Sequence, residues 1–367
     1  MNNAQRLHDL GQSLWLDNLS RELLEKGSLA RYVRDFALTG LTSNPTIFDK
    51  AIRHTPLYDE TIRRGARRDD GDDQAIFFTL ALEDLKRAAA LFRPSFDATR
   101  GRDGWVSLEV SPLLANDTAG TIAQVKNLHA RAGIPNLFIK IPGTPEGIPA
   151  IEECIVAGIP INVTLLFSSE QYVAAAGAYM RAVERRQAAG LSEPVRSVAT
   201  LFVSRWDVAV HDKVAEPLRN RLGIAVAHRT YRAYRRLLDS PAWRKLADAG
   251  APPQRLLWAS TGTKDPDASD VLYVEALAAP DTINTMPDAT LLAFADHGKV
   301  ERMLSADADG RDADALLDEF QRAGIDSAAL ADRLQREGAE AFVASWQDLL
   351  GCIAAKRGEK TAHAARV

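Results

Sequence analysis

The chain has 367 residues, of which 46% are hydrophobic, and its formal net charge is −4. This length supports a large core, and the small negative charge argues against a nucleic-acid-binding protein, which usually carries a basic excess. No stretch approaches the roughly 18 uninterrupted apolar residues of a membrane span, and the amino-terminal sequence lacks a signal-peptide pattern. We therefore expect neither nucleic acid nor membrane as a partner.

Cysteines are scarce in this chain. The two that occur, Cys154 and Cys352, have neither metal-ligand spacing nor the pattern of a disulfide framework. A reducing compartment is therefore expected, and a cytoplasmic location fits all of these features.

Short apolar runs typical of buried strands recur along the chain. They lie at Leu14–Asn18, Ala37–Ser43, Val106–Val110, Leu137–Ile141, Ile161–Phe167, Val198–Val203, Leu256–Ser260 and Thr282–Thr285. Longer helical patterns separate them, such as Asp73–Leu91 and Ser168–Arg185. This alternation predicts an α/β protein with a parallel sheet, and about eight units favour a closed (β/α)8 TIM barrel over an open doubly wound sheet.

Residues 1–367 are expected to form a single barrel domain with extra helices, several of them between the second and third strands. After the last strand, helical patterns lie at Ala313–Ala323, Ser327–Glu337 and Ala341–Ala355. Residues 288–355 are therefore predicted to be a helical C-terminal part that packs on the barrel as an extension. Residues 356–367 are predicted to be a polar tail.

A lysine, Lys140, lies inside the fourth apolar run, Asn136–Gly143. A lysine buried in such a strand must lose its charge, pair with a carboxylate or react. A desolvated amine is a nucleophile that forms Schiff bases with ketones. The sequence therefore predicts Schiff-base chemistry if other strands bring polar groups to the same place, with Phe138 and Leu166 as apolar neighbours of the amine.

Other strands do carry polar residues at suitable positions. Residues two apart on a strand share a face, and inward-facing polar groups of a barrel gather at its C-terminal mouth. The pairs that share a face are Trp15 and Asp17, Thr42 and Asn44, Ser107 and Glu109, Phe138 and Lys140, Asn162 and Thr164, and Thr200 and Phe202. We expect them to surround the amine with two carboxylates, two carboxamides and several hydroxyls.

Each polar residue also has a purely structural interpretation. Asp17 could cap a turn after the first strand, and Asn44, which precedes a proline, could form an Asx-type turn. Glu109 could be a structural counterion of the buried lysine. Asn162 and Thr164 could be satisfied polar groups of the interior. Convergence of independent strands on one face is what favours a functional site.

A phosphate site is also indicated near the ends of the sixth and seventh strands. Arg205 follows the sixth, and the seventh is followed by hydroxyls, a glycine and a lysine between Ser260 and Lys264. Backbone N–H groups and a cation in such a loop can hold a phosphate. The alternative is a turn with a solvated lysine.

Several of these segments together resemble the signatures of transaldolases. They are Thr42–Phe48, Phe138–Thr144 with Gly147 and Ile148, and Ile161–Phe167. Their order and spacing match from about Leu14 to Pro287, with weaker similarity through the C-terminal helices. The length and the Ser260–Lys264 stretch resemble the longer bacterial subgroup of these class I Schiff-base aldolase relatives.

The resemblance implies a (β/α)8 barrel and a cofactor-free transfer of a dihydroxyacetone unit in the pentose phosphate pathway, with no metal. The donors would be sedoheptulose 7-phosphate or fructose 6-phosphate, and the acceptors glyceraldehyde 3-phosphate or erythrose 4-phosphate. Small sugar phosphates would then be the partners of a monomer or homodimer.

The resemblance also implies roles for single residues. Lys140 matches the Schiff-base lysine, and Asp17 the general acid/base at the C4 hydroxyl. Glu109 and Thr164 match the pair that holds a catalytic water. The carboxamides that orient substrate hydroxyls match Asn44 and Asn162, while Thr42 and Ser107 match pocket-lining residues.

Arg205 matches a phosphate-binding arginine, whereas two other positions depart from the family pattern. Thr200 stands where many relatives have serine, which keeps the hydroxyl. Lys264 stands where shorter relatives use a second arginine, and lysine keeps the charge without the bidentate fork. A tyrosine at the position of Phe202 would hydrogen-bond the catalytic water and favour cleavage, so phenylalanine predicts transfer.

Three rival functions stay open at this point. The first is a class I sugar-phosphate aldolase, a lyase that uses the same imine. The second is a non-catalytic sugar-phosphate-binding barrel. The third, a metal-dependent aldolase, needs a cluster of ligands, and residues such as His54, His129 and His211 are scattered away from the key strand faces.

Overall fold

The structure is a computed structural model that describes residues 2–68, 72–301, 303–304 and 311–358. In these residues eight parallel strands close into a barrel, each paired with its neighbours in chain order, and β8 pairs with β1. The strands are β1 (Ser13–Asp17), β2 (Leu38–Thr42), β3 (Trp105–Glu109), β4 (Leu137–Pro142), β5 (Ile161–Leu166), β6 (Ser197–Phe202), β7 (Arg255–Ala259) and β8 (Ile283–Met286). The predicted (β/α)8 barrel is confirmed, and each predicted strand end lies within about one residue of the observed end.

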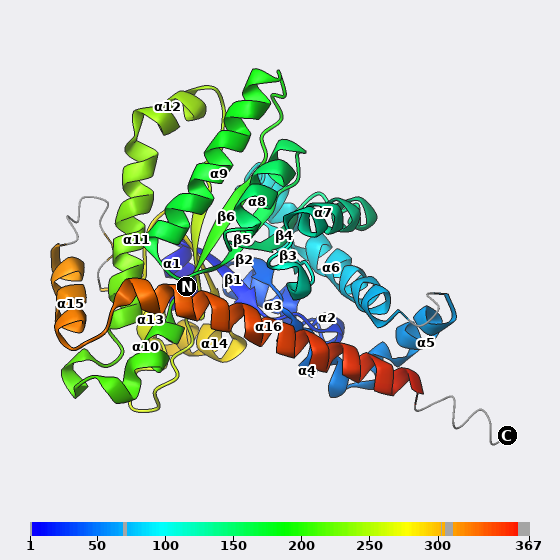
Figure 1. The fold of residues 1–367 in the computed structure, drawn as a ribbon. Helices are drawn as coiled ribbons and strands as arrows, with labels where there is room; N and C mark the ends of the chain where they lie inside the picture. Colours follow the sequence, from blue (N-terminus) through cyan, green and yellow to red (C-terminus); the bar gives the residue numbers. More distant parts are fainter. Residues whose placement is uncertain (1, 69–71, 302, 305–310, 359–367) are drawn as a thin grey trace.

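Helices surround this barrel (Figure 1). The α-helices of the described residues are α1 (Asn3–Asp9), α2 (Arg21–Glu25), α3 (Ser28–Asp35), α4 (Pro45–Arg53), α5 (Asp59–Arg68), α6 (Asp73–Ala98), α7 (Thr118–Ala132), α8 (Gly147–Val156), α9 (Ser169–Ala188), α10 (Ser204–Val210), α11 (Leu222–Asp239), α12 (Pro241–Asp248), α13 (Leu272–Ala276), α14 (Asp288–His297), α15 (Arg311–Arg322) and α16 (Ser327–Gly358). Short 3-10 turns are η1 (Pro56–Tyr58), η2 (Pro112–Leu114), η3 (His211–Lys213) and η4 (Glu216–Leu218).

Local sequence signals explain several helix ends. The side chain of Ser168 accepts a hydrogen bond from the backbone N–H of Gln171 and caps α9, as its position before the helix predicts. Several helices lie between β2 and β3, as expected from the long gap. One of them, α6, continues seven residues beyond the predicted end at Leu91 and passes through Pro94. An ion pair between Arg93 and Asp97, four residues apart, supports this last turn.

The barrel interior contains an aromatic layer below its C-terminal mouth. The Phe138 ring stacks on Trp105 with centroids 4.0 Å apart, and the centroid of Trp15 lies 6.2 Å from that of Phe138. Gly40 of β2 makes room for Trp15, because a Cβ atom at this position would lie 2.6 Å from the indole ring. The residues above Trp15 and Phe138 on the same strand faces are Asp17 and Lys140, so the aromatic layer is the floor of the polar mouth.

The opposite, N-terminal end of the barrel is closed by a buried cation with many partners. Arg255 donates hydrogen bonds to Asp103 at 3.0 Å, to the hydroxyl of Ser13 at 2.6 Å and to the carbonyl oxygen of Thr282 at 2.9 Å. Such a fully paired arginine has the contacts expected of a structural group.

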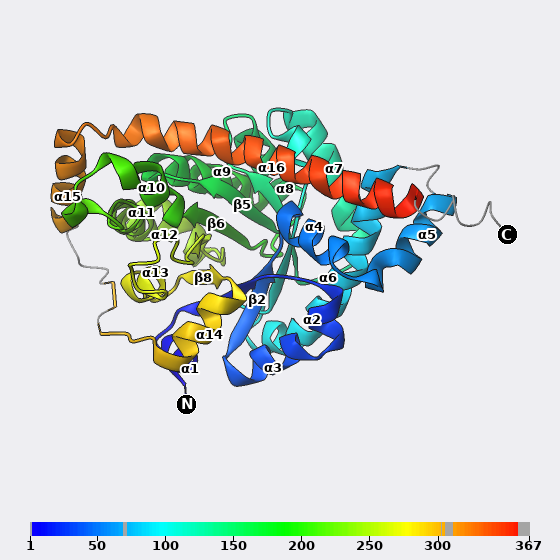
Figure 2. The same ribbon diagram turned by 90° about the horizontal axis from the view of Figure 1, so that it is seen from below.

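Helix α16 is one continuous element that runs from α15 on one edge of the molecule to α4 and α5 on the other (Figures 1 and 2). The predicted break between Glu337 and Ala341 is therefore wrong. The sequence suggested it because Gly338 lowers helix propensity. The predicted tail also begins too early, because α16 extends to Gly358, and residues 359–367 lie outside the described residues.

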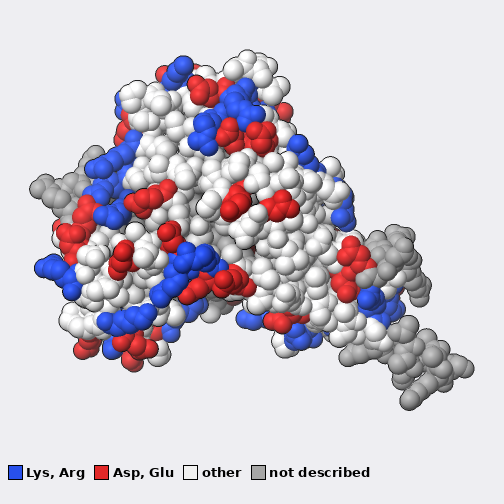
Figure 3. All heavy atoms as spheres, viewed as in Figure 1, with Lys and Arg blue, Asp and Glu red and all other residues white. Residues whose placement is uncertain are grey.

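On the face of the molecule in Figure 3, acidic and basic side chains are interspersed, and neither sign forms a single large patch. This mixture agrees with the small formal net charge of −4. None of the helices in the described ranges has the length and apolar character needed to cross a membrane.

Candidate active site

The polar residues predicted from the strand pattern meet at the C-terminal mouth of the barrel. Glu109 of β3 lies in register with Lys140 of β4, and Lys140 lies in register with Asn162 of β5. Parallel pairing thus places a carboxylate, an amine and a carboxamide on three adjacent strands. Because barrel active sites form at this mouth, we treat it as the candidate active site.

Lys140 is buried, with 4% of its surface exposed, and has few partners. Its Nζ atom donates to the carbonyl oxygen of Ser43 at 3.3 Å and to Oε2 of Glu109 at 3.4 Å. Both distances exceed the usual 2.7–3.2 Å of N–H···O hydrogen bonds. The amine is therefore desolvated and loosely held, unlike the guanidinium of Arg255 at the other end of the barrel.

Two buried oxygen atoms on the strands that flank β4 have no hydrogen-bonding partner in the described part of the chain. They are Oε1 of Glu109 and the hydroxyl oxygen of Thr164. Burial raises the pKa of the Glu109 carboxyl above its ordinary value, while the charge of Lys140 and its hydrogen bond oppose this shift. Buried polar groups in proteins are normally paired, so these two atoms suit a water molecule or a substrate group.

Asp17 lies at the end of β1 and is held by a chain of hydroxyls. Its Oδ1 atom accepts a hydrogen bond from Thr42 at 2.7 Å, and the Thr42 oxygen lies 2.8 Å from that of Thr285. Burial raises the pKa of the Asp17 carboxyl, while the Thr42 hydrogen bond and the charges of Lys140 and Lys264 oppose this. The carboxyl can thus hold a proton more readily than an exposed aspartate.

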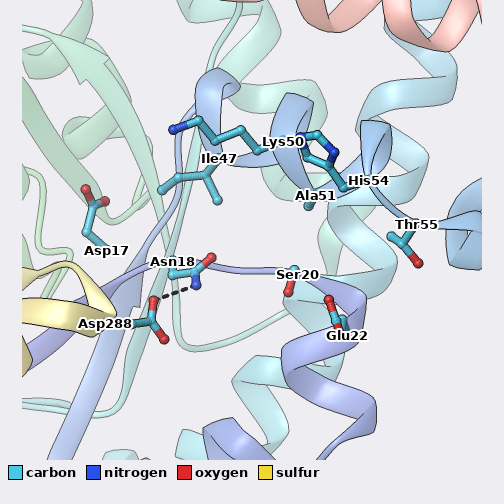
Figure 4. A pocket seen from close by; sticks show the side chains of 10 residues that line it. All are labelled: Asp17, Asn18, Ser20, Glu22, Ile47, Lys50, Ala51, His54, Thr55 and Asp288. Carbon is cyan, nitrogen blue, oxygen red and sulfur yellow. Dashed lines mark hydrogen bonds between the residues drawn. The ribbon is translucent and has the colours of Figure 1, made fainter. Parts of the chain in front are cut away.

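A pocket of about 350 Å³ opens beside Asp17 (Figure 4). Asn18 in its wall donates a hydrogen bond to Asp288 at 2.6 Å. Lys50 extends from α4 with its amine turned toward the Asp17 side, and His54 lies on the far side of the pocket. The pocket gives Asp17 contact with a polar space outside the barrel.

Asn162 is positioned from both sides by hydroxyl groups. Its Oδ1 atom accepts from Thr200 at 2.7 Å, and its Nδ2 atom donates to Ser107 at 3.2 Å. These two hydrogen bonds link β3, β5 and β6 and fix the carboxamide in one orientation.

Asn44 also reaches the mouth, but its carbonyl has a structural task. The Oδ1 atom accepts from the backbone N–H of Ile47 at 3.1 Å and caps α4. The turn interpretation from the sequence therefore holds for this oxygen. Asn44 also lines a small pocket together with Glu109 and Trp346.

The predicted phosphate residues flank the mouth on two sides. Arg205 lies in the first turn of α10, and burial lowers the pKa of its guanidinium while the charge of Glu109 opposes this. The Ser260 hydroxyl lies 2.8 Å from that of Ser204, and Ser260 adopts a left-handed backbone with φ of 56°. The positive charge of Lys264 lowers the pKa of the Asp17 carboxyl, so Lys264 lies toward the β1 side of the mouth. Lys264 also lines a second pocket together with Asp207.

The prediction that Leu166 is an apolar neighbour of the Lys140 amine is wrong. Leu165 has φ of 58°, and the pairing of β5 with β6 is irregular between Val163 and Leu166. This bulge changes the alternation of faces. Leu166 therefore packs in the outer core with Val163, while Leu165 joins the aromatic cluster that includes Phe202.

Comparisons with known proteins agree with this geometry. The family described as "Transaldolase/Fructose-6-phosphate aldolase" matches residues 14–353. The chain belongs to the transaldolase family. A transaldolase of Thiobacillus denitrificans is 44% identical over 96% of this chain and 100% of its own length. One of Acidothermus cellulolyticus is 45% identical over 94% of both chains, and one of Parafrankia sp. is 44% identical over 95% and 96%.

Sequence reasoning missed the contribution of the C-terminal helix to the site of this transaldolase-family enzyme. Gln335 of α16 is buried and donates to the carbonyl oxygens of Gly143 at 3.0 Å and of Leu165 at 2.9 Å. Both carbonyls lie at the mouth ends of β4 and β5. The only available signal was a glutamine next to the apolar positions of a predicted helix, which is a weak pattern.

Within the described ranges, no cluster of three or more His, Cys, Asp or Glu side chains has an arrangement that could hold a metal ion.

Proposed function

We propose that this enzyme transfers a dihydroxyacetone unit from sedoheptulose 7-phosphate to glyceraldehyde 3-phosphate through a Schiff base on Lys140. The products are erythrose 4-phosphate and fructose 6-phosphate, as in the transaldolase step of the pentose phosphate pathway. The observation that supports this most is the buried amine with two long contacts beside Glu109. The family match over residues 14–353 and the near-full-length relatives named transaldolase support the same reaction.

The reaction begins with imine formation. The free amine of Lys140 attacks the C2 ketone of the donor and forms a carbinolamine. A water between the unpaired oxygens of Glu109 and Thr164 carries a proton to the departing hydroxyl group, which leaves as water. Glu109 suits this task because burial raises its pKa, so it holds and passes on a proton more readily than an exposed glutamate.

Cleavage follows from the protonated imine, which acts as an electron sink. Asp17 takes the proton of the C4 hydroxyl, the C3–C4 bond breaks, and its electron pair moves into the imine to give an enamine. The C4 carbon leaves as the aldehyde of an aldose phosphate. The raised pKa of Asp17 favours its holding of this proton until the next step.

Transfer is completed when an acceptor aldehyde takes the place of the first product. The enamine carbon attacks the aldehyde carbon, and Asp17 returns its proton to the new hydroxyl. Hydrolysis of the imine then frees the product and Lys140. Such ping-pong kinetics succeed only if the enamine is shielded from water, and the floor of Trp15, Trp105 and Phe138 excludes water from below.

The rest of the mouth binds the substrate. Asn162, held by Thr200 and Ser107, presents a fixed carboxamide to the hydroxyls of the three-carbon unit. The amide nitrogen of Asn44 serves the same unit. Arg205 and Ser260 bind the phosphate at the far end of the sugar, and Lys264 supplies a second cation from the β1 side of the mouth.

A cytoplasmic location suits this chemistry, because phosphorylated sugars do not cross membranes freely. Cys154 and Cys352 are both buried, and two isolated cysteines suit a reducing compartment.

The rival lyase function is tested by supplying fructose 6-phosphate with and without erythrose 4-phosphate. Transfer predicts sustained turnover only with the acceptor. Sustained release of glyceraldehyde 3-phosphate without acceptor would favour the lyase. Phe202 strengthens the test, because Phe202→Tyr adds a hydroxyl beside the water site and is expected to raise cleavage relative to transfer. An unchanged ratio would refute this role of Phe202.

A further inference from the structure

The guanidinium of Arg205 lies near two aromatic rings from different parts of the chain. Its central carbon lies 5.2 Å from the ring centroid of Phe202, at the end of β6, and 5.9 Å from that of Phe342, on α16. Both distances are within the range of cation–π contacts. Phe202 is itself stacked on Phe167 at 5.4 Å, so one ring belongs to the rigid barrel and the other to the C-terminal helix.

Arg205 has no carboxylate or hydrogen-bonding partner among the residues that the structure describes. Its side chain is partly buried, and burial lowers the pKa of the guanidinium while the charge of Glu109 opposes this. Aromatic faces hold a guanidinium without occupying its N–H groups, whereas a carboxylate would use them. The N–H edge of Arg205 is therefore available for an anion.

Two other residues of α16 fix the helix at this place. Gln335 ties it to the ends of β4 and β5 through two hydrogen bonds. Gly338 lies one turn further on, where an added Cβ atom would stand 3.0 Å from Leu165 and 3.2 Å from Nη1 of Arg205. The glycine thus lets the helix approach the guanidinium closely, which gives a physical reason for a helix-weakening residue in mid-helix.

We propose that α16 completes the phosphate subsite by positioning Arg205, with Phe342 holding one face of the guanidinium and Gly338 leaving room beside it. The ligand is the phosphate monoester of the donor and acceptor sugars. This inference rests on the proposed function, because it assigns Arg205 to that phosphate. It gives the C-terminal helix a role in substrate selection: the helix favours phosphorylated over unphosphorylated sugars.

The test compares fructose 6-phosphate with fructose as donors, using erythrose 4-phosphate as the common acceptor. Phe342→Leu removes the ring at similar volume, and Phe342→Tyr restores it. We expect Phe342→Leu to lower the ratio of kcat/KM for fructose 6-phosphate to kcat/KM for fructose by about tenfold, because the loss of one cation–π contact weakens binding by about that factor. The loss is expected in KM for fructose 6-phosphate and in inhibition by inorganic phosphate, with kcat unchanged. Phe342→Tyr should match the wild type.

A matched control lies about two turns along the same helix. Leu349 is fully buried in the hydrophobic core and is not one of the residues whose rings lie near Arg205. Leu349→Ala loosens α16 without touching the guanidinium, so it should lower stability and leave the donor ratio unchanged. Equal changes of the ratio in Phe342→Leu and Leu349→Ala would overturn the proposal, since a merely structural helix behaves in that way.

Arg205→Ala separates this inference from the proposed function. If Arg205→Ala abolishes the preference for phosphate while Phe342→Leu keeps it, Arg205 binds phosphate without help from α16 and the inference fails alone. If Arg205→Ala keeps the preference, the phosphate lies elsewhere and both assignments fail. The inference is supported if Arg205→Ala and Phe342→Leu both lose preference for the phosphorylated donor while Phe342→Tyr keeps it.

Discussion

The amine of Lys140 lies 3.4 Å from the Oε2 atom of Glu109, and both side chains are about 5% exposed. The barrel contains a second buried ion pair, between Arg255 and Asp103, with a 3.0 Å contact and further hydrogen bonds to Ser13 and Thr282. The second pair is fully satisfied and lies at the end of the barrel away from the site. The two pairs are therefore expected to respond to mutation in opposite ways.

Removal of the structural carboxylate should affect stability alone. Asp103→Ala leaves the guanidinium of Arg255 buried without its counterion, which costs roughly 3–5 kcal/mol of unfolding free energy. Urea unfolding measures this loss, and kcat of the folded variant should stay near the wild-type value. A large fall in kcat with unchanged stability would show that this pair is not structural.

Removal of the reactive amine should have the reverse effect. Lys140→Met is expected to abolish transfer while leaving the unfolding free energy similar or higher, because two long hydrogen bonds are lost and Glu109 can become neutral. Paired activity and urea-unfolding measurements on this variant check the expectation. A loss of several kcal/mol would instead show that Lys140 is mainly a structural counterion.

Thr164 and Thr200 provide a comparison between two buried hydroxyls. The Thr164 hydroxyl has no partner in the described residues, whereas that of Thr200 donates to Asn162 at 2.7 Å. Thr164→Val should leave stability unchanged or raise it, yet slow imine formation by roughly 100-fold. Thr200→Val should lower stability by about 1 kcal/mol. Single-turnover kinetics and urea unfolding distinguish the two variants. Identical stability losses would contradict the view that the Thr164 hydroxyl is unpaired and the Thr200 hydroxyl is paired.

The Asp17 carboxyl gives a prediction about pH. Its pKa in the folded protein lies above the ordinary value of 3.8, so the folded state binds the proton more tightly than the unfolded state does. The stability that this group contributes is therefore present at low pH and lost as pH rises through the folded pKa. Asp17→Asn keeps the acceptor of the Thr42 hydrogen bond and stays neutral at every pH.

The difference in unfolding free energy between Asp17→Asn and the wild type should consequently grow in favour of the variant as the pH rises above the ordinary aspartate pKa of 3.8 and through the raised pKa of the folded state. Other carboxyls with raised pKa values, such as Glu109, are present in both proteins and largely cancel. The variant should also lose most of its transfer activity. A difference that shrinks with rising pH would contradict the direction assigned to Asp17.

The sequence was sufficient to locate the strands and the face that carries the site. Short apolar runs fixed β4 and β5, and the period-two rule placed Asp17, Lys140 and Asn162 together at one mouth. This works because parallel strands end at the same rim of a barrel, so local pattern and global position agree.

Features that depend on tertiary packing were not predictable from the pattern. The break expected near Gly338 reflects intrinsic propensity, whereas the close approach of Leu165 and Arg205 determines that position. The bulge at Leu165 changes the face of the sheet to which Leu166 points. The left-handed backbone of Leu165 could not be predicted, because nothing in a leucine-rich run indicates it. The contacts of Gln335 and Phe342 join parts of the chain that are more than a hundred residues apart.

The most direct test of the central claim is peptide mass spectrometry after borohydride reduction in the presence of fructose 6-phosphate. Reduction converts an imine between Lys140 and the sugar into a stable secondary amine. We predict a sugar adduct on the peptide that contains Lys140, accompanied by irreversible loss of activity, and no adduct there in Lys140→Met. An adduct confined to another lysine, or continued turnover by Lys140→Met, would contradict the account.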